Sequence, residues 1–255
     1  MTLLLDLPSA SASPLQRLDP RWKLAGLVAA ALALALVQSA WVALLGLAGA
    51  LLLAGVAGLP ARWFLERLGA ALLVPAFFAL WLPFVVRPDD VVQEIVGLSI
   101  SVTGVERAIA LLAKAAGVVT LVLVLLATAP LQDTFKAAQS LRIPAWLVHL
   151  GLMSYRYLHL LGDEFSRLRT ALRVRGYRNR ARLHSYRTIG QVAGTLLVRG
   201  HERSERVAQA MRCRGFDGQF RSLHQGQTRA ADVVFFAVVI LAAGTLLAWD
   251  LWIRW

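Results

Sequence analysis

The sequence predicts an all-α integral membrane protein with about five transmembrane helices and a large cytoplasmic helical region. Apolar residues make up 58% of the 255 residues and charged residues only 16%, whereas soluble domains average about 45–50% and 25%. Several apolar runs also approach the roughly 20 residues that a helix needs to cross the hydrocarbon of a bilayer. A single soluble core could not absorb this apolar excess, so lipid is the expected solvent for much of the chain.

The first apolar run extends from Leu24 to Leu59 and is interrupted at Gln38-Ser39. Because only 14 residues precede the interruption, the run predicts two short helices joined by a tight turn. Its glycines Gly46, Gly49 and Gly55 would let helices approach closely, either within this chain or against a partner. Internal packing and a partner contact both stay open at this stage.

Three further runs carry almost no charge at their centres, and each predicts one transmembrane helix. They extend from Trp63 to Val86, from Gly104 to Ala129 and from Ala230 to Ile253. We therefore assign residues 24–129 to four transmembrane helices and residues 230–255 to a fifth. The scarcity of ionisable groups in these spans argues against an ion pathway through the chain, because intramembrane charges usually mark one.

The net charge of +12 is concentrated between Leu131 and Ala230, where 18 Lys and Arg residues, 17 of them arginine, accompany six acidic residues. The positive-inside tendency predicts that residues 130–229 lie in the cytoplasm between two spans. By the same rule residues 1–23 are cytoplasmic, the loop from Arg87 to Thr103 is outside, and five spans place Trp255 outside. We expect no cleaved signal peptide, because no small-residue cleavage site follows the first basic residues.

Three helices are predicted within the basic block. Pro130 and Pro144 bracket the segment from Leu131 to Ile143, whose apolar spacing indicates a short amphipathic helix along the membrane surface. From Pro144 to Arg175 an apolar stripe continues over many turns and predicts one long helix. A second long helix is predicted to start at about Tyr186.

The two long helices end in the same heptapeptide pattern, Ala-[Leu/Met]-Arg-[Val/Cys]-Arg-Gly-[Tyr/Phe]. The first copy starts at Ala171 and the second at Ala210, 39 residues later. Capping explains part of the pattern, because glycine is a common C-cap and arginines complement the negative end of the helix dipole. Capping is not expected to require the second arginine, the alanine or the aromatic residue, so the duplication predicts two equivalent docking sites. The candidate docking residues are Arg173, Val174, Arg175, Gly176, Arg212, Cys213, Arg214 and Gly215.

These residues resemble the transmembrane T component of energy-coupling factor (ECF) transporters, in particular the CbiQ-like proteins of cobalt and nickel uptake. The features that carry the resemblance are Leu18-Asp19-Pro20-Arg21-Trp22-Lys23-Leu24, Tyr155-Arg156-Tyr157, and the paired Arg-Gly motifs with Glu202-Arg203 and Glu205-Arg206 before the second. The family motif is usually Ala-Arg-Gly. This sequence instead has Val174-Arg175-Gly176 and Cys213-Arg214-Gly215, with another fairly small residue in the first position.

The resemblance implies that Arg175 and Arg214 each insert into a groove on one of two cytoplasmic ABC-type ATPase subunits. The membrane helices would hold a separate substrate-binding membrane subunit, and the chain would couple the two within the inner (cytoplasmic) membrane. It would not be an enzyme, since it has no Gly-x-x-x-x-Gly-Lys-[Ser/Thr] phosphate-binding loop. The implied cargo is cobalt, with nickel or a vitamin as alternatives, and no cofactor is implied.

Two other classes of function stay open. The basic block could hold the phosphate headgroup of a lipid substrate in a membrane enzyme, although no acid, base or nucleophile constellation accompanies it. The chain could instead be a membrane scaffold that recruits a cytoplasmic partner without driving transport. Binding of lipid or nucleic-acid phosphates does not explain a duplicated heptapeptide, so we expect lipid contact but no nucleic acid. The five histidines lack ligand spacing and Cys213 is the only cysteine, so we expect neither a metal site nor a disulfide.

Overall fold

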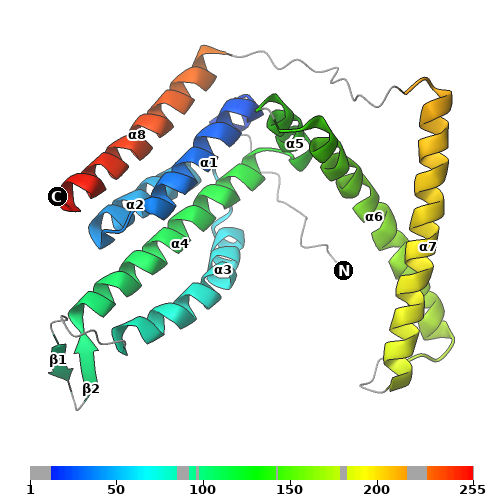
Figure 1. Ribbon diagram of the computed structural model, residues 1–255, viewed down its shortest axis with the longest axis horizontal. Coiled ribbons are helices and arrows are strands. Elements are labelled where there is room, and N and C mark those ends of the chain that lie inside the picture. Colours follow the sequence, from blue (N-terminus) through cyan, green and yellow to red (C-terminus); the bar gives the residue numbers. More distant parts are fainter. Residues whose placement is uncertain are drawn as a thin grey trace. The chain divides into compact units, whose positions relative to one another are not determined.

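The protein separates into two compact units that are almost entirely helical (Figure 1). The first unit contains helices α1 to α5 and α8, and the second contains α6 and α7. The all-α membrane class predicted from the sequence is confirmed. The computed structural model describes residues 13–84, 92–95, 98–141, 143–178, 183–216 and 229–254.

Within the described residues, three helices of the first unit are long and apolar enough to cross a membrane. They are α3 (Ala61–Trp81), which continues into the 3-10 helix η2 (Leu82–Phe84), α4 (Val102–Thr128) and α8 (Ala230–Arg254). Half of the most apolar stretch of α4 is buried, against 6% for α3. Helix α4 is therefore the central helix of this unit, whereas α3 leaves most of its apolar surface for lipid or a partner.

The first apolar run folds as two 17-residue helices, α1 (Pro20–Leu36) and α2 (Ala40–Val56). The predicted pair of short helices with a tight turn is thus confirmed. At 1.5 Å per residue each helix is about 25 Å long, slightly shorter than the roughly 30 Å of hydrocarbon in a bilayer. Crossing of the membrane by both helices stays a prediction, and with it the total of five spans.

The loop predicted between Arg87 and Thr103 contains a small antiparallel hairpin that the sequence did not reveal. Its strands are β1 (Val92–Ile95) and β2 (Leu98–Ser101), and Val92 pairs with Ser101. Strand β2 leads directly into α4, whose N-cap Ser101 accepts a hydrogen bond from the Gly104 N–H at 3.1 Å. The hairpin therefore fixes the entry of the chain into the central helix.

Small residues let α1, α2 and α4 pack closely. Leu34 of α1 is buried between Gly46 of α2 and Gly117 of α4, and a Cβ atom at either glycine would overlap a Leu34 methyl group. A Cβ at Gly49 or Gly55 would meet nothing within 4 Å. Of the two roles considered for the first-run glycines, Gly46 serves internal packing, whereas Gly49 and Gly55 face away from the unit.

Replacing Gly46 by alanine should destabilise the first unit, because the new methyl group must displace a Leu34 side chain that Gly117 holds from the other side. Overpacking of this kind typically costs about 1–3 kcal/mol. Thermal unfolding of the purified chain in detergent measures the loss. Gly49→Ala in the same helix is the matched control and should be neutral or slightly stabilising. Equal unfolding temperatures for the two variants would contradict this packing.

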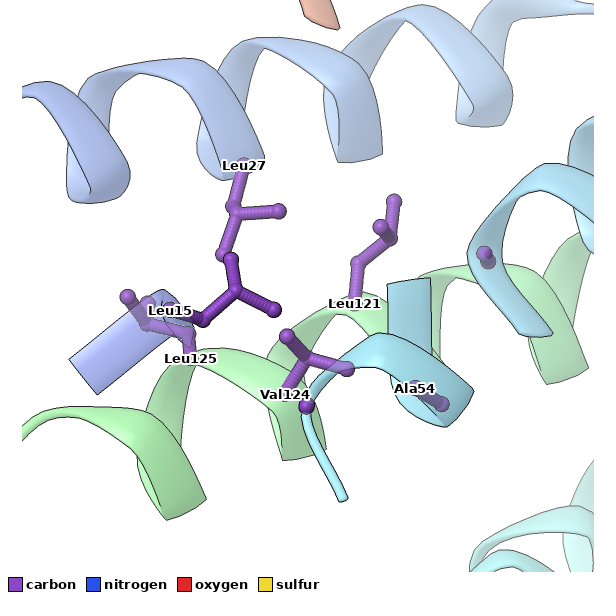
Figure 2. Packing of buried hydrophobic residues seen from close by; sticks show 8 residues of the cluster. Leu15, Leu27, Ala54, Leu121, Val124 and Leu125 are labelled. Carbon is purple, nitrogen blue, oxygen red and sulfur yellow. The ribbon is translucent and has the colours of Figure 1, made fainter. Parts of the chain in front are cut away.

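The N-terminal segment is part of the bundle. The 3-10 helix η1 (Pro14–Arg17) inserts Leu15 into a buried apolar cluster with Leu27 of α1 and Leu121 and Val124 of α4 (Figure 2). Leu15 is only 3% exposed. Its burial means that the segment before α1 is held against α4.

The remaining helices follow the predicted pattern. The short helix between the two prolines is α5 (Leu131–Ser140), which packs against α1 within the first unit. The second unit consists of α6 (Ala145–Val174) and α7 (Leu183–Cys213), with 30 and 31 residues. Both predicted long helices are confirmed, and α7 starts three residues before the expected Tyr186.

Candidate functional site

The first heptapeptide forms the C-terminal end of α6 as a Schellman motif. Gly176 has a positive φ of 77°, a conformation that favours glycine because other residues clash there. The Gly176 N–H donates to the Arg173 carbonyl at 3.0 Å, and the Tyr177 N–H donates to the Leu172 carbonyl at 3.0 Å. These two bonds satisfy carbonyl groups that a helix end otherwise leaves without a partner.

The second heptapeptide repeats this geometry at the end of α7. Gly215 also has a φ of 77°, its N–H donates to the Arg212 carbonyl at 3.0 Å, and the Phe216 N–H donates to the Met211 carbonyl at 3.1 Å. The pattern of exposure is also the same at all seven positions. In each copy the Leu or Met and the final aromatic residue are half-buried, and the other five residues are exposed.

This geometry corrects one expectation from the sequence. In a Schellman motif the residue after the glycine commonly makes an apolar contact with a residue five or six positions earlier. Tyr177 and Phe216 therefore do belong to the cap, together with Leu172 and Met211. Capping now accounts for the Leu or Met, the glycine and the aromatic residue of each copy, but it does not require two arginines in both.

The predicted docking residues are all on the surface, at the tips of the two helices. Arg173, Arg175, Arg212 and Arg214 are exposed, as are Val174, which is 83% exposed, and Cys213. Within the described part of the chain, no salt bridge involves any of these four arginines. Each helix tip therefore presents two guanidinium groups that form no ion pair with a carboxylate of the residues described.

The structure does not bring the two motifs together but holds them apart. The Tyr177 hydroxyl donates to the Ser185 carbonyl at 3.4 Å, which connects the first motif to the start of α7. The second motif lies at the other end of α7, about 28 residues or 42 Å farther along the helix. Figure 1 shows the motif-bearing ends of α6 and α7 at opposite ends of this unit. One small ligand could not touch both motifs, whereas two separate protein subunits could.

Helices α6 and α7 contact each other near their middles. Glu164 of α6 forms an ion pair with Arg199 of α7. Around this pair lies a cleft of about 210 Å³, lined mostly by charged residues, among them Asp163, Arg167 and Arg203, and by Leu160 and Leu161. A contact of this kind leaves both helices largely exposed, and it places one docking motif on each side of the crossing.

Apolar side chains also remain exposed on both long helices, including those of the apolar stripe that predicted α6. On α6 they recur at helical spacing along one face, at Leu147, Leu150, Leu158, Leu161 and Phe165. On α7 the stretch from Thr188 to Val198 has no charged residue, and its Ile189, Leu197 and Val198 are exposed. Apolar surface of this extent marks an interaction site or a membrane contact.

Other residues singled out in the sequence lie within helices. Tyr155 packs the edge of its ring against His159, one turn later in α6, with ring centroids 5.3 Å apart. His201 and Glu205 lie 3.5 Å apart on α7, with both side chains mostly exposed. Among the described residues there is no group of three or more His, Cys, Asp and Glu side chains placed to hold a metal ion.

Comparison with known proteins agrees with the resemblance noted in the sequence. Residues 11–225 match the family model described as CbiQ, cobalt transport protein. The cobalt transport protein CbiQ of Rhodobacter capsulatus is 31% identical over 159 residues, which cover 59% of this chain and 63% of the relative. The nickel permease LarQ of Lactiplantibacillus plantarum is 27% identical over 128 residues, covering 50% and 44%. In both cases the match spans less than two thirds of the relative. Since the family match extends over most of the sequence, this membrane protein belongs to the CbiQ family of cobalt transport proteins.

Proposed function

We propose that this chain is the T component of an ECF-type importer, which transmits the closure of two cytoplasmic ABC-type ATPase subunits to a separate substrate-binding membrane subunit. The observation that carries the proposal is the repeated helix tip, in which one backbone motif presents two exposed arginines at each of two distant places. Two equivalent ATPase subunits would need two equivalent docking sites, and the two helix tips would provide them.

Arg175 and Arg214 are the central docking residues of this proposal. Each directly precedes the glycine at which the backbone turns sharply, so its side chain extends from the very end of a long helix. A guanidinium group is planar and makes several hydrogen bonds at once. It is also more weakly hydrated than an ammonium group, so burying it in an interface costs less. An arginine at a helix tip is therefore suited to insertion into a groove of a partner.

The exposed apolar face of α6 and the uncharged first half of α7 fit the second partner, a substrate-binding subunit embedded in the membrane. Leu150 is 59% exposed and Leu197 is 74% exposed. Burying such side chains stabilises a complex by about 25 cal/mol for each Å² removed from water. Helices that carry ATPase motifs at their tips and apolar residues along their sides would contact both partners.

The remaining parts of the proposal concern location and cargo. We place the chain in the inner (cytoplasmic) membrane with α6 and α7 on the cytoplasmic side. Residues 131–230, which contain these helices, carry the entire net charge of +12, and positive charge favours the cytoplasmic side. We propose cobalt as the cargo and nickel as the alternative, from the names of the family and of the two relatives. ATP hydrolysis is assigned to the partner subunits.

A pull-down of the tagged chain from its native membrane tests the proposal. We expect two ATPase subunits and a small membrane protein to co-purify, and cells that contain the complex to accumulate radioactive cobalt. Accumulation of nickel in place of cobalt would change the cargo and keep the coupling role. A wild-type chain that co-purifies with no ATPase would refute that role and favour a scaffold or a lipid-modifying enzyme.

Introducing charge on the apolar face of α6 should abolish binding of the membrane subunit without affecting binding of the ATPase subunits. Leu150→Glu combined with Leu158→Glu should release the membrane subunit, because two carboxylates would have to be desolvated at the contact. Both ATPase subunits should still co-purify, since the helix tips are unchanged. The matched control is His159→Glu, an exposed position on another face of α6. Retention of the membrane subunit by the double variant would show that this face contacts something else.

A further inference from the structure

Two points of the first unit bound the cytoplasmic region that the sequence predicts: the end of α4, which α5 of the same unit follows, and the start of α8. The proposed coupling region, residues 130–229, lies between these two points. Both points are attached within the first unit to one short segment, Leu15 to Lys23, that precedes and begins α1. Lys23 makes the attachment to α4, and the backbone of Asp19 makes the attachment to α8.

Lys23 is only 1% exposed. Its ammonium group donates to the Leu15 carbonyl at 2.7 Å and to the carbonyl of Thr128, the last residue of α4, at 3.1 Å. The Thr128 hydroxyl lies 3.5 Å away. The last carbonyl groups of a helix have no partner within the helix, so the lysine satisfies one of them and holds α4 against the N-terminal segment.

Asp232, in the first turn of α8, is also 1% exposed. One carboxylate oxygen accepts from the Asp19 N–H at 2.8 Å, and the other accepts from the Arg229 N–H at 2.7 Å. Asp19 is in turn the N-cap of α1. A ring contact between Trp22 and Phe236, with centroids 5.2 Å apart, adds to the same junction. The start of α8 is thereby fixed to the start of α1.

We propose that Lys23 and Asp232 are positioning residues that clamp the two ends of the coupling region to the N-terminal segment, so that displacement of α6 and α7 is passed on to the membrane helices. The inference rests on the proposed coupling function. Apolar packing alone would hold α1, α4 and α8 together. The buried charges of Lys23 and Asp232 are not needed for that, and such charges are costly unless they are fully hydrogen-bonded. The hydrogen bonds of these two side chains to backbone atoms are directional, so they fix the positions of the end of α4 and of the start of α8.

The test uses the full complex reconstituted in liposomes, with Lys23→Met in the chain. This side chain has nearly the same length but cannot donate. We expect normal co-purification of the ATPase subunits and continued ATP hydrolysis, with uptake per ATP reduced about tenfold or more. Hydrogen exchange should increase around Leu15 and at the end of α4. It should stay low at the start of α8, where Asp232 keeps both of its donors.

Lys136→Met is the matched control, because this exposed lysine on α5 forms its ion pair with the neighbouring Asp133, three residues earlier in the same helix. It should leave uptake per ATP and hydrogen exchange unchanged. An assembled Lys23→Met complex with wild-type uptake per ATP would overturn the inference. If that variant does not assemble, Asp232→Asn replaces it, since the amide retains one acceptor oxygen. Raised exchange at Asp19 without loss of coupling would then be the contrary result. Failure of the coupling role itself is distinguishable, because the wild-type chain would then bind no ATPase.

Discussion

Replacing both Arg175 and Arg214 by alanine should release the ATPase subunits and abolish uptake. Truncating a desolvated arginine in an interface typically costs about 2–5 kcal/mol, and each 1.4 kcal/mol corresponds to about a tenfold change in affinity. One substitution should therefore weaken its site by roughly 30-fold or more. Pull-down and uptake measurements of the single and double variants test this expectation.

Two other arginines of α7 provide a close control for this experiment. Arg187 and Arg203 are exposed arginines of α7 outside both motifs, so Arg187→Ala with Arg203→Ala removes the same charge. This control should retain ATPase binding, with at most a change in its salt dependence. Arg175→Lys and Arg214→Lys keep the charge but lose the planar group, and they should restore binding only in part. Wild-type binding by the double alanine variant would refute docking through the two tips.

Replacing Asp250 by alanine should destabilise the membrane bundle, because this carboxylate supports the start of α2 from the far end of α8. Asp250 lies near the end of α8 and is 2% exposed. Its carboxylate accepts from the Ser39 N–H at 2.8 Å and from the Gln38 N–H at 3.2 Å. These donors precede α2 and their hydrogen bonds to the carboxylate are partly buried, so losing both charge-assisted bonds should cost about 2–4 kcal/mol. Thermal unfolding in detergent measures the loss.

Two further variants separate the hydrogen bonds from the charge. Asp250→Asn retains one acceptor oxygen and should lose only part of the stability. Asp133→Ala removes an exposed carboxylate of α5 and should change the unfolding temperature little, because exposed ion pairs contribute about 0–1 kcal/mol. If Asp250→Ala unfolds at the wild-type temperature, α8 does not support the start of α2 in the way described.

Much of the helical plan could be predicted from local patterns. The apolar runs located α3, α4 and α8, and the proline stops with the long apolar stripe located α5 and α6. Interruption of the first run at Gln38-Ser39 predicted the α1–α2 turn. The structure adds the reason that the interruption is tolerated, because Asp250 accepts hydrogen bonds from both of these backbone N–H groups. Periodicity and turn chemistry are properties of neighbouring residues, so a single sequence reveals them.

Other features depend on partners far away in the chain and could not be predicted. Asp232 and Asp250 contact residues more than 200 positions earlier, and in the sequence they are merely two charges near the ends of an apolar run. Lys23 was assigned to the N-terminal segment before the first transmembrane helix, yet it lies in α1 and is buried. The sequence indicated the candidate docking residues, but the capping role of Tyr177 and Phe216 required the hydrogen bonds of both helix ends.

The crossing of α6 and α7 has a mechanical consequence under the proposed function. If the helices turn about the ion pair between Glu164 and Arg199, each docking arginine lies at the end of a lever. The arm to Arg175 is about 16 Å long and the arm to Arg214 about 22 Å, at 1.5 Å per residue. Equal displacements of the two ATPases would rotate α6 through the larger angle, while equal forces would exert the greater torque on α7. Two docking sites with the same backbone motif would thus move their helices by unequal amounts, even if the two ATPase subunits close symmetrically.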